Sequence, residues 1–299
     1  MSKKIRCLNS SGRAKGREKA QVVSELRQKY PLEDLLALSG LARSTYFYNA
    51  KRQPKDKFPE VKRAITEIFT ENKGRYGYRR TTIALRQKGM VLNHKTVLKL
   101  MRELGIKGKQ RKNKYKSYRG EIGKVSPNLI KRNFKAMKPF EKLATDVTEF
   151  KIGEEKIYLS PIIDMYNNEI LSYSISNSPT FWQTREMMAD LYKRLPKGSR
   201  PILHSDQGWQ YQMKEFQCSL KKHNIRQSMS RKGNCLDNAV MENFFGRLKV
   251  EMFYGEKFQS ADEFVRRLKE YIEYYNNDRI SLALNGMSPV QYRFNSKLT

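Results

Sequence analysis

The chain has 299 residues, of which 38% are hydrophobic and 11% aromatic, so it holds enough apolar side chains to fold and is not disordered throughout. Its three cysteines, Cys7, Cys218 and Cys235, lie far apart and form no Cys-x-x-Cys pair, which argues against disulfides and structural zinc. No apolar run has the length of a membrane span, and 60 Lys and Arg against 30 Asp and Glu give a net charge of +30.

The positive charge is concentrated in the N-terminal half. Residues 1–142 contain 38 Lys or Arg and 11 Asp or Glu, a net charge of +27, whereas residues 143–299 contain 22 and 19, a net charge of +3. Short basic runs usually serve only as solvated surface, but an excess sustained over half a chain favours contacts with phosphates. The composition therefore predicts a nucleic-acid-binding half followed by a half able to form an enzyme core.

Residues 1–55 predict a first helical domain. The segment EKAQVVSELRQKY reads as a helix, PLEDLLALSG as a second helix closed by Gly40, and LARSTYFYNAKR as a third. In a helix-turn-helix, Arg43 and Tyr46 of the third helix would reach DNA. In an ordinary three-helix bundle, Tyr46 would instead be a packing residue, and the local pattern does not decide between the two.

Residues 56–110 predict a second helix-turn-helix domain. The helix PEVKRAITEIFTEN is followed by GRYGYRRTTIALRQKGM, which carries Arg79 and Arg80 and ends at Gly89. Asn93 is a suitable N-cap for the recognition helix HKTVLKLMREL. The DNA-contact candidates of this helix lie on one exposed face near its start: Asn93, His94, Lys95 and Lys99.

Residues 111–142 lose this periodicity and are dense in Lys and Arg. They are expected to be a basic linker, which either stays flexible along a phosphate backbone or folds only on DNA.

The remaining chain predicts an α/β core over residues 143–255, completed by a C-terminal helix and tail over residues 256–299. Three strand-like runs, LATDVTEFKI, KIYLSPIIDMY and EILSYSIS, precede an alternation of helix and strand that ends in the helix containing ENFFGRLK. This order predicts a mixed five-stranded sheet covered by helices. The segment SADEFVRRLKEYIEYYNNDR is an amphipathic helix capped by Ser260.

Three acidic residues of this core are placed to converge. Asp146 falls on the first strand, Asp206 follows the fourth, and Glu242 lies on the helix after the last strand. Open α/β sheets bind ligands at the carboxyl ends of their strands. Three carboxylates, with substrate phosphates and water, suffice for a pair of Mg²⁺ ions in phosphoryl transfer. We therefore predict that Asp146, Asp206 and Glu242 are catalytic metal ligands acting on a phosphodiester.

Basic and polar residues surround these acids in the sequence. Lys249 shares a helix face with Glu242 and either binds a phosphate of a DNA end or pairs with Glu251 on the surface. Arg247 and Lys232, the latter in a turn-forming loop, are further DNA-contact candidates. Asn238, four residues before Glu242, either orients Glu242 or a water molecule or simply packs locally.

Several neighbouring residues stay open to two interpretations. Gln207 and Gly208 are expected to shape the loop after Asp206, whereas Trp209 and Tyr211 either stack on DNA or pack beneath it. Two further acids, Asp164 and Asp237, are plausible decoys, and Asp164 is the natural control for mutagenesis.

Four segments of the chain together carry a family resemblance: GRYGYRR, HSDQGWQY, SMSRKGNCLDNAVMENFFGRLKVE and YNNDRISLALNGMSPVQYR. In order and spacing they resemble motifs of the second-frame (OrfB) transposases of the bacterial insertion-sequence family three, which share their catalytic fold with retroviral integrases. The resemblance implies a ribonuclease-H-like core with Asp146, Asp206 and Glu242 as the DDE metal ligands. It also implies that water cleaves one strand and that the exposed 3′-hydroxyl attacks another phosphodiester, without a covalent protein intermediate.

This resemblance implies double-stranded DNA as the partner, both at the terminal inverted repeats of an element and at its target. It further implies Mg²⁺, or Mn²⁺, as cofactor, a homo-oligomer that pairs two DNA ends, and an upstream OrfA protein or frameshift fusion. The expected location is the bacterial cytoplasm, in association with the nucleoid. Two alternatives remain: a ribonuclease-H-type endonuclease that does not join DNA, and a catalytically inert DNA-binding regulator.

Overall fold

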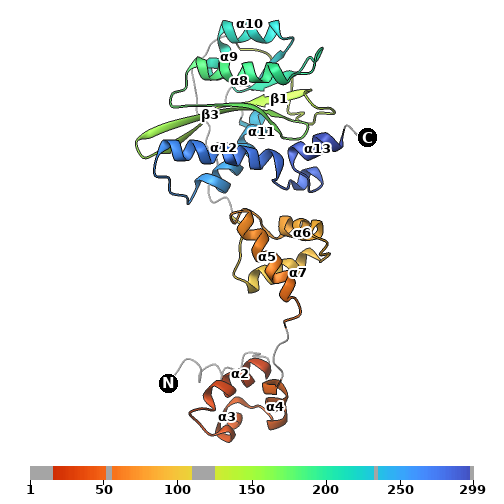
Figure 1. Ribbon diagram of the computed structural model, residues 1–299, viewed down its shortest axis with the longest axis vertical. Coiled ribbons are helices and arrows are strands. Elements are labelled where there is room, and N and C mark those ends of the chain that lie inside the picture. The colour runs from red at the N-terminus through yellow and green to blue at the C-terminus, as the bar shows by residue number, and fades with distance from the viewer. Residues whose placement is uncertain (1–15, 52–55, 110–124, 232–234, 297–299) are drawn as a thin grey trace. The chain divides into compact units, whose positions relative to one another are not determined.

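The computed structural model describes residues 16–51, 56–109, 125–231 and 235–296 (Figure 1). The chain divides into two compact units, residues 1–60 and 61–299. Within the described residues, no helix is both long and apolar enough to cross a lipid bilayer.

The first unit contains the expected helices α2 (Gly16–Leu26), α3 (Leu32–Ser39) and α4 (Arg43–Lys51). Gly40 ends α3 in the left-handed conformation, with φ of 64°, which glycine adopts without a Cβ penalty. Tyr46 is 2% exposed and packs in a small core with Val23 and Leu36. The expectation that Tyr46 reaches DNA is therefore wrong, because its ring is needed to fill the interior of the bundle.

The helices of the second predicted DNA-binding domain are α5 (Pro59–Glu71), which starts at the end of the first unit, and α6 (Tyr78–Gln87) and α7 (His94–Glu103) of the second unit. Asn93 caps α7 as expected, since its side chain accepts a hydrogen bond from the Lys95 N–H. The buried stripe of α7 consists of Val97, Leu100 and Met101.

The rest of the second unit is built on a mixed sheet, as the sequence predicts. Its strands are β1 (Lys142–Thr145), β2 (Thr148–Ile152), β3 (Glu155–Asp164), β4 (Ile170–Ser176), β5 (Ile202–Ser205) and β6 (Arg226–Met229). They follow the order β2-β3-β1-β5-β6, in which β2 and β1 pair with successive parts of β3, and β4 pairs with β3 outside this path. The contacts of β3 with β1, β2 and β4 are antiparallel, and those of β5 with β1 and β6 are parallel.

The single strand expected over residues 143–152 is interrupted, so the described sheet has six strands where the sequence predicts five. The pairs Thr145–Ile162 and Thr148–Leu159 belong to one continuous register, which places Asp146 opposite Pro161. Proline has no N–H to donate to a ladder. The pairing is absent at Asp146 and Val147, so it stops at the residue predicted to carry chemistry.

Helices cover both faces of the sheet (Figure 1). The helices α8 (Phe181–Arg194), α9 (Trp209–Gln212) and α10 (Lys214–Lys222) lie on one side, and α11 (Ala239–Leu248) and α12 (Ala261–Asn277) on the other. Leu143 packs toward α8, whereas the next residue, Ala144, packs toward α11 and α12. This alternation follows from the period of two along a strand.

Two segments differ from the sequence prediction. Within the expected linker, residues 125–141 pack on the core: Ile130 is buried, and the Leu129 N–H donates to Ser228 Oγ at 2.9 Å. Residues 110–124 lie outside the described residues. The expected tail contains a further helix, α13 (Pro289–Asn295), which begins with a capping box at Ser288.

Candidate active site

Asp146 directly follows β1 on the face of the sheet that α11 covers. It lies two residues after Ala144, which packs against that helix, and strand periodicity directs both side chains to one face. The Val147 N–H donates to Asp146 Oδ1 at 2.7 Å. The backbone where the ladder stops therefore helps to hold this carboxylate.

Asp206 reaches the same place from the neighbouring strand. Because β1 and β5 run parallel with Ala144 opposite His204, Asp146 and Asp206 stand two residues further along each chain, at the carboxyl ends of adjacent strands. The Gly208 N–H donates to Asp206 Oδ1 at 2.9 Å. A Cβ on Gly208 would lie 3.0 Å from that oxygen, so a larger residue here would press on the carboxylate.

Glu242 approaches from the first turn of α11. Its neighbours Met241 and Phe245 are fully buried and anchor the helix to the sheet. The carboxylate of Glu242 is near enough to Asp146 to raise the pKa of that group.

The electrostatics of these acids are unfavourable without a counter-charge. Burial, and then the charge of Asp206, raise the pKa of Asp146 well above its ordinary value, although hydrogen bonds from Val147 and Asn238 oppose the rise. Burial also raises the pKa of Asp206. Carboxylates that are buried together favour either a shared proton or a bound cation.

The donor set fits a hard divalent cation, because it consists of carboxylate oxygens. Among the described residues, however, no three His, Cys, Asp or Glu side chains are arranged to hold an ion by themselves. A cation bound here would take only part of its ligands from the protein, as Mg²⁺ commonly does when phosphates and water complete its shell.

Asn238 bonds to a different acid from the one its spacing suggests. Its Nδ2 donates to Asp146 Oδ2 at 2.8 Å. The sequence places Asn238 one helical turn before Glu242, but a contact with residue 146 depends on how α11 packs on β1. No local sequence signal predicts it.

Lys249 faces the acidic group and not Glu251. Its Nζ lies 5.2 Å from the centre of the Phe150 ring. Burial lowers the pKa of Lys249, while the charges of Glu149 and Asp146 oppose that change. Glu251 is 5% exposed and is bonded to Arg279 at 2.6 and 2.9 Å, so it is a buried partner of that arginine and not a surface residue.

The two suspected decoys have structural partners. Asp164 accepts hydrogen bonds from the backbone N–H groups of Phe140 and Tyr166, and it pairs with Leu143 at the opposite end of β1 from Asp146. Burial raises the pKa of Asp164 to about 6. Because its partners lie at the far end of β1 from Asp146, Asp164 remains a suitable mutational control.

Asp237, the residue before Asn238, is more important than the sequence suggests. Its buried carboxylate accepts from Arg231, Arg132 and Asn128. The hydrogen bond from Arg231 is the largest cause that lowers the pKa of Asp237. Asp237 thus anchors the turn that leads into α11.

The aromatic residues after Asp206 separate into two roles. Tyr211 is fully buried beneath the site, with its hydroxyl 3.4 Å from Thr145 Oγ1. Trp209 is 51% exposed at the start of α9. Tyr211 is therefore a packing residue, and only Trp209 is accessible to DNA.

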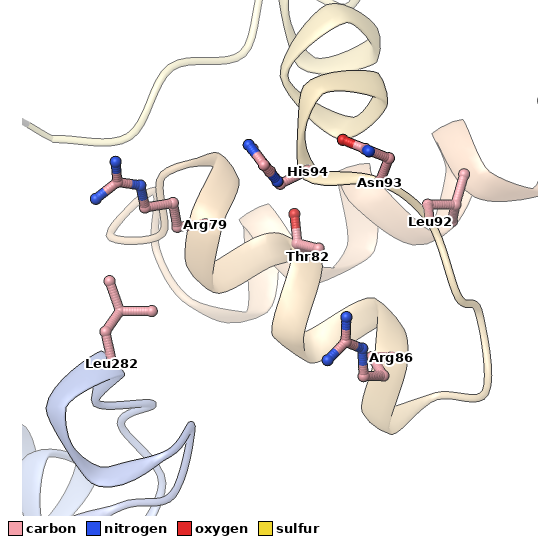
Figure 2. Close-up of a pocket in the computed structure, with 7 residues that line it drawn as sticks. All are labelled: Arg79, Thr82, Arg86, Leu92, Asn93, His94 and Leu282. Carbon is pink, nitrogen blue, oxygen red and sulfur yellow. The ribbon is translucent and has the colours of Figure 1, made fainter.

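The second helical domain presents a separate polar hollow. It has a volume of about 500 Å³ and is lined by Arg79, Thr82, Arg86, Leu92, Asn93, His94 and Leu282. Figure 2 shows His94 and Asn93 at the start of one helix, and Arg79 and Arg86 on the other. The candidates Arg79, Asn93, His94, Lys95 and Lys99 are all exposed.

Arg80 does not belong to this surface. Its Nη1 lies 3.2 Å from Glu251 Oε1, and its guanidinium lies over the Tyr76 ring. The expectation that Arg80 contacts DNA is wrong, because its charge is used to attach α6 to the segment after α11. Arg43 is exposed and 3.4 Å from Glu33, Arg247 is half-buried, and Lys232 lies outside the described residues.

Comparison with protein families gives three matches along the chain. Residues 57–114 match an HTH-like domain, and residues 136–235 and 242–296 match two families described as Integrase core domain. Asp146 and Asp206 fall in the second of these ranges, and Glu242 opens the third.

The chain is 51% identical over 274 residues to the putative transposase InsK for insertion sequence element IS150 of Escherichia coli, covering 91% of this chain and 97% of the relative. It is 38% identical to the transposase InsF for insertion sequence IS3A of Escherichia coli, covering 76% and 80%. A simian T-cell lymphotropic virus intasome structure aligns at 17% identity with a TM-score of 0.46, covering 77% of this chain and 73% of that one.

Proposed function

The chain belongs to the DDE transposases of the bacterial insertion-sequence family three, and from this membership we propose how its residues cleave and join DNA. The family acts in DNA transposition and integration as polynucleotidyl transferases. One observation carries the proposal: Asp146 and Asp206 stand at the ends of two paired parallel strands, and Glu242 lies in the first turn of the helix α11 that packs on that face of the sheet.

In this proposal Asp146, Asp206 and Glu242 hold a pair of Mg²⁺ ions, which Mn²⁺ can replace. Support comes from the hard oxygen donors and from the raised pKa values of Asp146 and Asp206. A bound cation would lower both pKa values, because it stabilises the ionised carboxylates. When bound, such a pair neutralises the charge that develops on a phosphodiester during in-line displacement. The hydrogen bonds from Val147 and Gly208 fix the two strand-end carboxylates before DNA arrives.

Lys249 is proposed to bind a phosphate of the DNA end. Its ammonium is held near the acids by packing over Phe150, so it is positioned for a phosphate that also reaches the metal site. Arg247, one residue before the end of α11, is proposed to contact the same DNA further from the reacting centre. Lys232 remains a candidate from sequence alone.

DNA affinity is proposed to come from the basic N-terminal half. The exposed side chains around the hollow of α6 and α7 and Arg43 in the first unit would neutralise phosphates. Affinity of this kind arises from counterion release and falls steeply with salt.

The proposed partners are the two ends of an insertion element and a target duplex. Since an element has two ends, we propose that at least two copies of the chain act together, with an upstream OrfA protein or fusion supplying further end recognition. The proposed place of action is the cytoplasm, on nucleoid DNA.

The test is the joining of a labelled, pre-cut 3′ DNA end to a second duplex, with Mg²⁺ and with Mg²⁺ removed by chelation. Glu242→Gln and Asp206→Asn should abolish joining, whereas Asp164→Asn, checked by its melting temperature, should retain it. Cleavage without joining by the intact chain would favour the endonuclease alternative. Binding without either reaction would favour an inert regulator or the need for an upstream partner.

A further inference from the structure

Asn238 has an unusual hydrogen-bonding state next to the acidic group. Its side chain is 7% exposed, and its Nδ2 donates to Asp146 Oδ2 at 2.8 Å. The other half of the amide, Oδ1, is buried and accepts no hydrogen bond from any group of the described residues. Buried acceptors in native proteins are normally paired, because an unpaired one retains its full desolvation penalty.

The position of Asn238 in the helix makes this state more informative. Asn238 is the N-cap residue of α11, and asparagine is among the side chains that best cap a helix by accepting a backbone N–H. Here the side chain makes no capping hydrogen bond. Nδ2 is bonded to Asp146 instead and Oδ1 accepts from no described group, so neither end of the amide serves the helix.

The surrounding structure holds Asn238 in place. The Asp237 carboxylate is fixed by Arg231 and Arg132, and the Asp237 carbonyl lies 2.9 Å from His204 Nε2. His204 is two residues before Asp206 on β5. The backbone at Asn238 is thus tied to the same strand that positions the second acid, and Asn238 is preorganised relative to both acids.

An unpaired amide oxygen beside carboxylates can be satisfied only by a hydrogen-bond donor. The carboxylates themselves donate nothing when ionised, and no group of the described residues, Lys249 included, donates to this oxygen. A water molecule is the donor that fits a buried polar site of this kind, since buried waters typically satisfy such groups.

We propose that Asn238 is a positioning residue that acts on both sides of the reaction centre. Nδ2–H fixes the carboxylate of Asp146 in the orientation that binds the cation, and Oδ1 accepts a hydrogen bond from the water molecule that attacks DNA. This deepens the proposed function and rests on it. An amide does not take up a proton, so the role of Asn238 is to orient the water and not to deprotonate it.

Cleavage and joining use different nucleophiles, so comparing them separates the role of Asn238 Oδ1 from that of Nδ2–H. Cleavage of an uncut end uses water as the nucleophile, whereas joining of a pre-cut end uses the 3′-hydroxyl of the DNA. Loss of Oδ1 should therefore impair cleavage more than joining. Loss of Nδ2–H should impair both, and should weaken metal binding even without DNA.

The experiment compares Asn238→Leu and Asn238→Ala, which remove both amide groups, with Asn238→Asp, which keeps an acceptor and loses the donor. In the full-length chain, Mn²⁺ affinity is measured by calorimetry without DNA, and cleavage and pre-cut joining are measured in parallel. For Asn238→Leu and Asn238→Ala we expect Mn²⁺ affinity to fall about tenfold, as for other groups that orient metal ligands. We expect cleavage to fall at least tenfold more than joining.

Ser172→Ala is the matched control, because Ser172 Oγ is also buried without a partner among the described residues but lies on β4. It should leave Mn²⁺ affinity and both reactions unchanged. Equal losses of cleavage and joining in Asn238→Ala, at unchanged Mn²⁺ affinity, would overturn the proposal and leave a purely structural role. If the unmodified chain is inactive, it is an inert regulator or needs an upstream partner, and an Mn²⁺ affinity unaffected by Asn238→Leu still rejects the positioning role.

Discussion

Glu251 and Arg279 form a buried, two-pronged ion pair in which Arg279 Nε and Nη2 donate to the two carboxylate oxygens at 2.9 and 2.6 Å. Arg80 of α6 lies 3.2 Å from the same carboxylate, and the Tyr271 hydroxyl donates to it at 3.0 Å. Glu251 belongs to a π-helical turn, Lys249–Phe253, that directly continues α11. One carboxylate therefore connects the second helical domain, the C-terminal segment and the helix that carries Glu242.

Replacing Glu251 by Gln should destabilise the second unit at neutral pH. Removing one partner of a buried pair leaves an uncompensated charge, here on Arg279, which typically costs about 3–5 kcal/mol. Thermal unfolding followed by circular dichroism measures the loss. Glu154→Gln is the control, because Glu154 is an exposed residue whose loss should change stability by under about 0.5 kcal/mol.

The same pair gives a pH dependence. Burial alone would raise the pKa of Glu251, but the hydrogen bonds and charge of Arg279 outweigh it and lower the pKa to about 2, from 4.5. The stability that Glu251 contributes is therefore complete above pH 4.5 and is lost as pH falls toward 2. The stability difference between the unmodified chain and Glu251→Gln should shrink over that range; a constant difference would contradict this account.

Gly208→Ala should impair catalysis more than folding. The added Cβ would lie 3.0 Å from Asp206 Oδ1 and 2.7 Å from Gln210 Nε2, and Gln210 can move more easily than a carboxylate fixed by the Gly208 N–H. A displacement of this size at a reacting centre costs roughly tenfold to hundredfold in rate. Single-turnover joining measures it. Gly77→Ala, whose Cβ meets nothing within 4 Å, should keep full activity.

Trp209→Ala should weaken binding of a DNA end with an unpaired overhang. Stacking of a base on an exposed aromatic ring contributes about 1–3 kcal/mol, which corresponds to a roughly 5- to 150-fold change in Kd. Fluorescence anisotropy with a labelled end measures the change. Trp182→Ala is the comparison, since Trp182 is also exposed, at 62% against 51% for Trp209, but lies on α8 against Arg185. Equal effects of both substitutions would show that Trp209 has no special contact.

Arg79 and Arg80 are adjacent in sequence but should behave differently in DNA binding. Loss of a phosphate contact reduces the dependence of log affinity on log salt by about 0.9 per contact. Arg79→Ala and Lys95→Ala should each reduce that slope. Arg80→Ala should leave the slope unchanged and lower the melting temperature, because its partner is Glu251. A reduced slope in Arg80→Ala would place that residue at the DNA after all.

The sequence by itself determined most of the order of helices and strands, although not the split of the first strand or the helices α9 and α13, together with the caps at Asn93 and Ser260 and the three acids as candidates. These features depend on local periodicity, on capping chemistry and on the ligand preference of divalent cations, all of which short segments express. The family resemblance and the mixed sheet, both inferred from such segments, are confirmed by the family matches and by the strand order.

Only the tertiary structure decided which side chains lie at the acidic site, which are exposed to DNA and which are buried. Tyr46 and Arg80 carry side chains suited to DNA, yet one fills a core and the other an internal ion pair. Asn238 bonds to Asp146, a residue 92 positions away. Such partners are set by which faces of helix and strand meet, and that depends on the packing of whole elements and not on the spacing of residues within one of them.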